Sequence, residues 1–170
     1  MSVRYRTYGV TPLLARRRLK KEMAAVDEER GAVQVLLVED DPLVARVYAQ
    51  HFSHSGMTVH VATNGEDGVA FALRFHPDVM LLDIHLPGIS GIEVLRTMST
   101  SADLSSIPIV VLSNDADPGL AADCWRLGAL GYFVKSQTTP GQLLAQLHVW
   151  LGAAAAHVER DVTTRLARMA

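Results

Sequence analysis

Residues 78–91 read DVMLLDIHLPGISG, and this stretch decides the fold. Its apolar run, residues 79–82, is typical of a strand that is buried on both faces. The run ends at the acidic Asp83, and the Pro-Gly pair at 87–88 marks a loop directly afterwards. A carboxylate that closes a buried strand and opens a loop stands where open parallel sheets bind their ligands.

Three further polar segments follow apolar runs in the same way. They are Glu39-Asp40-Asp41 after residues 33–38, Ser113 after residues 109–112, and Lys135 after residues 132–134. Because the C-terminal ends of parallel strands meet at one edge of the sheet, we expect these groups to converge there. Carboxylates, a hydroxyl and an ammonium at one point predict a site for a cation and a phosphoryl group.

Strand and helix patterns alternate five times from residue 33 onward. The expected strands are 33–38, 57–62, 79–82, 107–112 and 130–134, and the expected helices are 42–56, 64–75, 90–100, 118–127 and one from Thr139-Pro140. This alternation predicts an α/β, flavodoxin-like three-layer sandwich with a five-stranded parallel sheet in the order 2-1-3-4-5 and helices on both faces. That order places Glu39, Asp40 and Asp83 on neighbouring strand ends.

Apolar spacing predicts which helix faces point inward. The inward stripe expected for the first helix is Val44, Val47, Tyr48, His51 and Phe52, and for the third helix it is Ile92, Leu95 and Met98. The more polar strand 57–62 is expected at an edge of the sheet.

Composition and charge limit the functions to consider. The 170 residues contain no apolar run long enough to span a membrane and no secretory signal, and the single Cys124 excludes an internal disulfide, so a cytoplasmic protein is expected. Residues 1–30 carry eight Lys/Arg against four Asp/Glu, whereas residues 31–150 carry five against twelve. An acidic central domain is a poor binder of nucleic-acid backbones but concentrates divalent cations.

Three segments are therefore expected. Residues 1–30 form a basic N-terminal arm, either helical or disordered, and Met23 is an alternative start of the chain. Residues 31–151 form the central domain. Residues 152–170 keep a helix-like apolar spacing and form a C-terminal helical extension that can pack against a partner.

Each polar residue also has a plain structural explanation. Asp83 alone fits a helix N-cap equally well, and Asp41 fits one best. Ser113, Tyr132 and Lys135 taken singly fit loop or packing roles. Their joint placement at the right strand ends favours a functional site.

The chemistry of such a site follows from its side chains. Mg²⁺ prefers oxygen ligands and commonly takes one or two carboxylates, which Glu39, Asp40 and Asp83 supply. An ionised Asp83 can act as a nucleophile on phosphorus and form an acyl phosphate. Lys135 would pair with one phosphoryl oxygen, and Ser113 would donate a hydrogen bond to another.

These motifs together resemble the receiver domain of bacterial response regulators over about residues 32–151. The resemblance rests on VLLVEDDP at 35–42, DVMLLDIHLPGISG at 78–91, IPIVVLS at 107–113 and GALGYFVKS at 128–136. It implies that Asp83 is the phosphoacceptor and that Glu39, Asp40, Asp83 and the backbone carbonyl of His85 bind Mg²⁺.

The resemblance also assigns the remaining site residues. It makes Lys135 the phosphate-binding lysine, Ser113 the switch hydroxyl and Tyr132 the switch aromatic, which turns inward on activation. His85 and Asp115 occupy the positions that tune the lifetime of the acyl phosphate. Two residues depart from the family pattern: Ser136 replaces a proline that is often in a cis bond, and Asn114 replaces a small residue.

The first functional hypothesis is a single-domain response regulator. It takes a phosphoryl group from a histidine kinase or phosphotransfer protein as a stoichiometric acceptor, not as an enzyme, and signals to an unknown protein target by contact. Dimerisation through residues 118–127, 130–134 and the last helix, or through the C-terminal extension, is a further option. No DNA-binding domain is expected.

Two alternatives stay open at this level. One is a phosphorylation-independent binding module whose basic arm contacts nucleic acid or anionic membrane. The other is a phosphatase with an Asp nucleophile and Mg²⁺, a chemistry that often uses a second Asp where His85 stands here.

Overall fold

The computed structural model describes residues 31–152. The expected basic arm and the C-terminal extension beyond Gly152 therefore lie outside the described residues. The described part is built around one sheet of five parallel strands in the order β2-β1-β3-β4-β5, which confirms the predicted fold class. Its strands are β1 (Gln34–Val38), β2 (Thr58–Ala62), β3 (Val79–Asp83), β4 (Ile109–Ser113) and β5 (Gly131–Val134).

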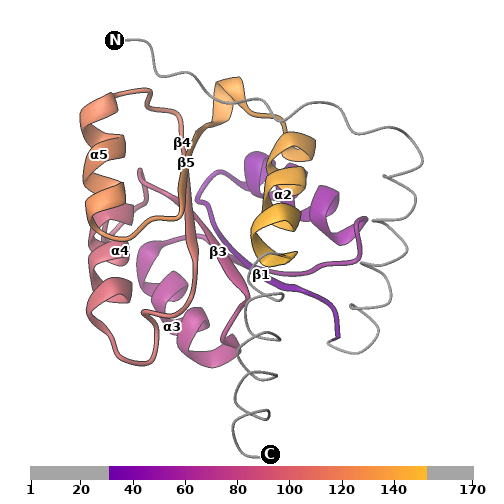
Figure 1. Ribbon diagram of the computed structural model, residues 1–170, viewed down its shortest axis with the longest axis horizontal. Helices are drawn as coiled ribbons and strands as arrows, with labels where there is room; N and C mark the ends of the chain where they lie inside the picture. The colour runs from indigo at the N-terminus through magenta and orange to yellow at the C-terminus, as the bar shows by residue number, and fades with distance from the viewer. Residues whose placement is uncertain (1–30, 153–170) are drawn as a thin grey trace, which may run out of the picture. The chain divides into compact units, whose positions relative to one another are not determined.

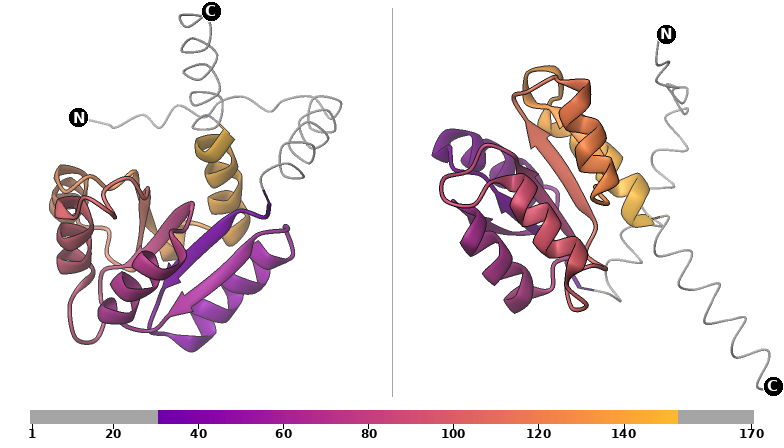
Figure 2. Two further views of the ribbon diagram at one scale, coloured as in Figure 1. Left: turned by 90° about the horizontal axis from the view of Figure 1, so that it is seen from below. Right: turned by 90° about the vertical axis from the view of Figure 1, so that its left-hand side faces the viewer.

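Helices cover both faces of this sheet, as Figures 1 and 2 show. They are α2 (Pro42–Ser53), α3 (Gly65–Phe75), α4 (Gly91–Thr100), α5 (Pro118–Arg126) and a last helix that is described over residues 140–152. Their starts follow from local chemistry, because a polar side chain caps each of them. Asp41 accepts hydrogen bonds from the amides of Leu43 and Val44, as its expected capping role requires. Ser90 and Glu93 form a reciprocal capping box.

Alternating strand residues feed two separate hydrophobic layers. On one face, residues such as Leu36 and Leu82 pack against α3, α4 and α5. On the other face, residues such as Leu37 and Leu81 pack against α2 and the last helix. The central strands β3 and β4 are buried along their whole length, which explains their continuous apolar sequence.

The predicted inward stripe of α2 is partly wrong. Tyr48 and Phe52 are buried as expected, but Val47 is 55% exposed and His51 is also exposed. Ala45 takes the buried place instead. Ala45, Tyr48 and Phe52 are spaced three and four residues apart and so share one face of the helix, which leaves Val47 and His51 outside it.

The register of the sheet sets the heights of the polar groups. Val38 pairs with Leu82, so Glu39 and Asp83 stand level, one residue further on. Asp83 pairs with Leu112, which puts Ser113 one residue higher than Asp83. Ser113 pairs in turn with Val134, so Lys135 starts two residues above the level of Asp83 and two strands away.

Gly91 is packed against the backbone that carries Asp83. A Cβ at Gly91 would lie 2.1 Å from the Asp83 carbonyl oxygen and 2.7 Å from Ile84 Cα, and neither backbone atom can move aside freely. We expect Gly91→Ala to lower the free energy of unfolding by about 3 kcal/mol, measured by urea titration.

The matched control is Gly141→Ala at the start of the last helix, where the nearest atom to a Cβ lies 3.6 Å away. This change should leave stability equal or slightly higher, because alanine favours helix over glycine. Equal stability of the two variants would contradict the close packing at Gly91.

Candidate functional site: an acidic cluster and a lysine at the sheet edge

Three carboxylates meet at the C-terminal ends of β1 and β3. Oxygen atoms of Glu39, Asp40 and Asp83 all lie within 4.8 Å of one another. Glu39 and Asp83 are only 1% and 4% exposed, whereas Asp40 is exposed. Two buried carboxylates at this distance need a cation, because each disfavours the ionisation of the other.

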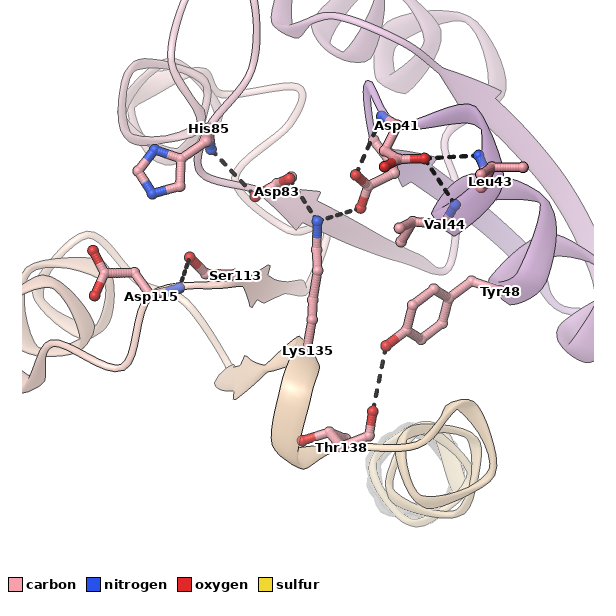
Figure 3. Close-up of polar contacts among 11 residues, drawn as sticks. Asp41, Leu43, Val44, Tyr48, Asp83, His85, Ser113, Asp115, Lys135 and Thr138 are labelled. Carbon is pink, nitrogen blue, oxygen red and sulfur yellow. Dashed lines mark hydrogen bonds and ion pairs between the residues drawn. The ribbon is translucent and has the colours of Figure 1, made fainter.

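Lys135 supplies one positive charge to both buried carboxylates. Its Nζ lies 2.6 Å from Asp83 Oδ2, as can be followed in Figure 3. The same Nζ lies 2.5 Å from Glu39 Oε2. Lys135 opens a 3₁₀ turn, Lys135–Gln137, that follows β5 directly. Since β5 is two strands away from β3, only a long side chain can reach across β4 to this position.

Burial shifts the pKa values of Glu39 and Lys135 in opposite directions. Burial raises the pKa of Glu39, and the nearby Asp83 adds to the rise, while Lys135 offsets only part of it. Burial lowers the pKa of Lys135, but its hydrogen bonds to Asp83 and Glu39 outweigh this, so the net shift is upward. The lysine is therefore held in its charged form, and the ionised form of Glu39 is disfavoured.

This imbalance predicts that Glu39 weakens the metal-free fold. A carboxyl group whose pKa is raised on folding lowers stability as the pH rises above its unfolded value of 4.5. We expect Glu39→Gln to raise the free energy of unfolding in EDTA by about 1 kcal/mol at neutral pH. Urea unfolding at neutral and acidic pH measures this difference.

The gain from Glu39→Gln should shrink as the pH falls toward 4.5, where wild-type Glu39 also becomes neutral. Glu93→Gln is the comparison, because the hydrogen bonds of Ser90 lower the pKa of the Glu93 carboxyl. That variant should lose stability instead. A destabilised Glu39→Gln protein at neutral pH would show that Lys135 outweighs burial.

The donor set fits a hard divalent cation. All three side chains offer carboxylate oxygens, the donors that Mg²⁺ prefers, and exposed Asp40 leaves an open side for water ligands. The buried Glu39 Oε2 is paired with the Lys135 ammonium at 2.5 Å. Such an atom has lone-pair capacity left for a metal ion.

His85 lies directly beyond the acidic cluster. Its backbone amide donates to Asp83 Oδ1 at 3.2 Å, which orients the Asp83 carboxylate. The imidazole is exposed and points away from Lys135 (Figure 3). The predicted metal-binding role of its carbonyl and its lifetime-tuning role stay predictions.

Ser113, Tyr132 and Asp115 form a second group beside the cluster. Ser113 is fully buried, and its Oγ accepts from the Asp115 amide at 3.1 Å. The Tyr132 hydroxyl donates to the Asp115 carbonyl at 2.8 Å. Burial raises the pKa of Tyr132, so its hydroxyl stays a donor at neutral pH. The predicted switch residues are thus linked to one another through Asp115.

The two departures from the family pattern take definite positions. Ser136 is exposed within the 3₁₀ turn, and the described residues contain no cis peptide bond. Asn114 is exposed beside the buried Ser113. Both residues are exposed, so neither is packed into the buried part of the site.

Two neighbours of the site were not predicted from the sequence. Tyr48 is buried below Lys135, and its hydroxyl donates to the Thr138 carbonyl at 3.5 Å in the loop that follows the lysine. Glu66 accepts from the Ile89 amide at 3.2 Å and so holds the loop after β3. The phenol of Tyr48 within an otherwise apolar stripe was a signal in the sequence that its hydroxyl would need a hydrogen-bond partner. For Glu66, nothing in its spacing indicated a contact 23 residues away.

Comparison with known proteins identifies the family. The model of the response regulator receiver domain matches residues 35–148. The chain belongs to the response regulator receiver family. Among relatives of this receiver, protein PilH of Pseudomonas aeruginosa is 32% identical over 102 residues, covering 60% of this chain and 84% of PilH. The cell cycle transcriptional regulator CtrA of Caulobacter vibrioides is 29% identical, covering 78% of this chain and 56% of CtrA.

Solved structures agree with this assignment. The chemotaxis response regulator CheY4 of Vibrio cholerae is 25% identical, with a TM-score of 0.64 over 69% of this chain and 97% of that chain. The BeF3-activated receiver domain of Klebsiella pneumoniae RstA is 32% identical, with a TM-score of 0.65 over 69% and 97%.

Some of the relatives are much longer than the matched region. The match covers only 22% of the regulatory protein AtoC of Escherichia coli, and about half of CtrA. Within the described residues, none of the helices is long and apolar enough to cross a membrane.

Proposed function

We propose that this receiver accepts a phosphoryl group on Asp83 from a histidine kinase or a phosphotransfer protein, with Mg²⁺ as cofactor. The observation that carries the proposal is the single ammonium of Lys135 in contact with both Glu39 and Asp83. This arrangement places a cation beside the buried Asp83 carboxylate, where phosphoryl charge would develop.

The proposed phosphoryl transfer involves Asp83 and the groups that contact it. An oxygen of Asp83 forms a bond to phosphorus while the bond between phosphorus and the donor's leaving atom breaks, and an acyl phosphate results. Lys135 stays beside Asp83 and neutralises a phosphoryl oxygen, and the amide of His85 orients the other Asp83 oxygen. Glu39, Asp40 and Asp83 would hold Mg²⁺, which would supply further charge neutralisation. The protein is a stoichiometric acceptor in this scheme, not an enzyme.

The signal leaves by protein contact. Exposed apolar side chains lie on and near α5, β5 and the last helix, where they can meet a target or a second copy of the chain. They are Trp125 at 56% exposure, Leu130 at 44% and Val149 at 62%. A cytoplasmic location accords with a cytoplasmic kinase partner and forms part of the proposal.

Intact-mass measurement tests this function directly. The wild-type chain incubated with Mg²⁺ and acetyl phosphate should gain about 80 Da, the mass of one phosphoryl group. Replacing Mg²⁺ with EDTA should remove the gain. Rapid multiple turnover of a phosphomonoester without a stable protein adduct would favour the phosphatase alternative instead.

A further inference from the structure

The first turn of α3 is packed against residues 84–90, the β3–α4 loop, which joins Asp83 to α4. Glu66 Oε1 accepts a hydrogen bond from the Ile89 amide at 3.2 Å. The neighbouring Gly65 has no room for a side chain, because a Cβ there would lie 2.5 Å from both the carbonyl oxygen and Cγ1 of Ile89. The start of α3 therefore holds the middle of this loop by a hydrogen bond and by close packing.

The Glu66 carboxylate also lies against the backbone of Gly88. A Cβ at Gly88 would lie 2.5 Å from Glu66 Oε1 and 2.7 Å from Glu66 Oε2, so the carboxylate occupies the space that a side chain would need. Gly88 has a φ of 77°, in the left-handed region that glycine adopts without strain. The β3–α4 loop thus presents its backbone to Glu66 at two successive residues, Gly88 and Ile89.

The same loop carries the backbone group that orients Asp83. At one end of the loop the His85 amide donates to Asp83 Oδ1 at 3.2 Å. At the other end the Gly91 amide donates to the Ile84 carbonyl at 2.9 Å, which closes the loop against the end of β3. Because the loop is closed in this way, a displacement of its middle would also move the His85 backbone relative to Asp83.

We propose that Glu66 is a positioning residue for Mg²⁺ binding, acting through the β3–α4 loop and the His85 backbone. The inference rests on the metal-binding part of the proposed function, in which Glu39, Asp40 and Asp83 would hold the ion. Glu66 is not one of these carboxylates, and it contacts the loop that orients Asp83. Loss of a group that orients metal ligands from outside typically weakens metal binding by about 10–100-fold.

This role needs an acceptor oxygen at the length of a glutamate side chain, and not a negative charge. Glu66→Gln keeps the oxygen and removes the charge. Glu66→Asp keeps the charge, but its side chain is one methylene shorter and falls short of the Ile89 amide. Glu66→Ala removes both. If the carboxylate acted on Mg²⁺ through its charge, aspartate would replace glutamate and glutamine would not, whereas holding the loop predicts the reverse.

Titration of MgCl₂ into the ¹⁵N-labelled chain, without a phosphodonor, measures the affinity through the amide signals of residues 84–89. We expect Glu66→Gln to keep the wild-type dissociation constant for Mg²⁺, and Glu66→Asp and Glu66→Ala to raise it about tenfold. Asp67→Asn is the matched control, because it removes an exposed carboxylate from the same helical turn. This variant should bind Mg²⁺ like wild type.

Amide hydrogen exchange in EDTA tests the same contact without any metal. The Ile89 amide should exchange about tenfold faster in Glu66→Asp and Glu66→Ala than in wild type and Glu66→Gln. The amide of Val111, in the buried strand β4, is the internal reference. Its exchange should be the same in all variants, which separates a local loss of the loop contact from a general loss of stability.

The outcomes separate this inference from the proposed function. A wild-type chain that binds Mg²⁺ but takes up no phosphoryl group contradicts the proposed function, and the Mg²⁺ affinities of the Glu66 variants still decide the inference. Equal Mg²⁺ affinity in wild type, Glu66→Asp and Glu66→Ala overturns the inference alone. Weakened binding by Glu66→Gln with normal binding by Glu66→Asp also overturns it, because charge would then decide. A wild-type chain that binds no Mg²⁺ contradicts both.

Discussion

Replacing Asp83 by asparagine should abolish phosphoryl uptake from acetyl phosphate. The amide has no anionic oxygen to attack phosphorus, although it fills the same space and still accepts a hydrogen bond from Lys135. We expect the rate of incorporation to fall at least about 10³-fold, as losses of a nucleophile do. Intact mass after incubation with Mg²⁺ and acetyl phosphate measures it.

Asp103→Asn is the matched control, because Asp103 is an exposed aspartate in the loop before β4. It should gain phosphate like wild type. Neutral hydroxylamine should remove the phosphate from the wild type, since it cleaves acyl phosphates and leaves phosphoserine intact. Uptake by Asp83→Asn at the wild-type rate would refute the assignment of Asp83.

Replacing Lys135 by methionine should strongly destabilise the metal-free protein. Glu39 and Asp83 have side chains only 1% and 5% exposed, and they would lose their shared cation. Breaking a buried ion pair on one side costs about 3–5 kcal/mol, because an uncompensated charge stays buried. Urea unfolding in EDTA at neutral pH measures the loss.

The pH dependence of this loss follows from Glu39. Its pKa is raised by burial and partly lowered by Lys135, so removing the lysine raises it further. The deficit of Lys135→Met should therefore be largest at neutral pH and shrink as the pH falls and the carboxylates become protonated. A deficit that is constant with pH would mean lost packing and not lost charge.

Lys135→Arg separates charge from geometry. The guanidinium keeps the positive charge, so most of the stability should remain. Its planar fork cannot reproduce a point contact to Glu39 and Asp83 together, so phosphoryl uptake should slow. A Lys135→Arg protein as unstable as Lys135→Met would show that the site has no room for any other cation.

The sequence predicted the sheet because its signals are local. The continuous apolar run before Asp83 is typical of burial on both faces, and Asp41-Pro42 is a favoured start of a helix. Strand order then followed from the alternation of strands and helices. The position of Glu39 beside Asp83 depends only on that order and on register.

The sequence-based predictions were wrong or incomplete where packing against residues far away in the sequence determines burial and contacts. Ala45 and Val47 lie on nearly opposite sides of α2, so a helix that contacts the sheet through Ala45, Tyr48 and Phe52 leaves Val47 exposed. Tyr48 meets Thr138, 90 residues later, and Glu66 meets a loop from another strand. The hydrogen bonds from the Asp115 amide to Ser113 and from the Asp117 amide to Asp115 were not predicted either, because a polar segment at 113–117 is equally compatible with a solvated loop.

The cluster at the sheet edge is assembled from distant parts of the chain. Fifty-two residues separate Lys135 from Asp83, and β5 joins the sheet only through β4. Under the proposed function, a chain in which β5 has not yet paired with β4 would lack Lys135 beside Asp83 and would take up the phosphoryl group poorly. Competence to receive the signal would thus report that the sheet has folded at least as far as β5.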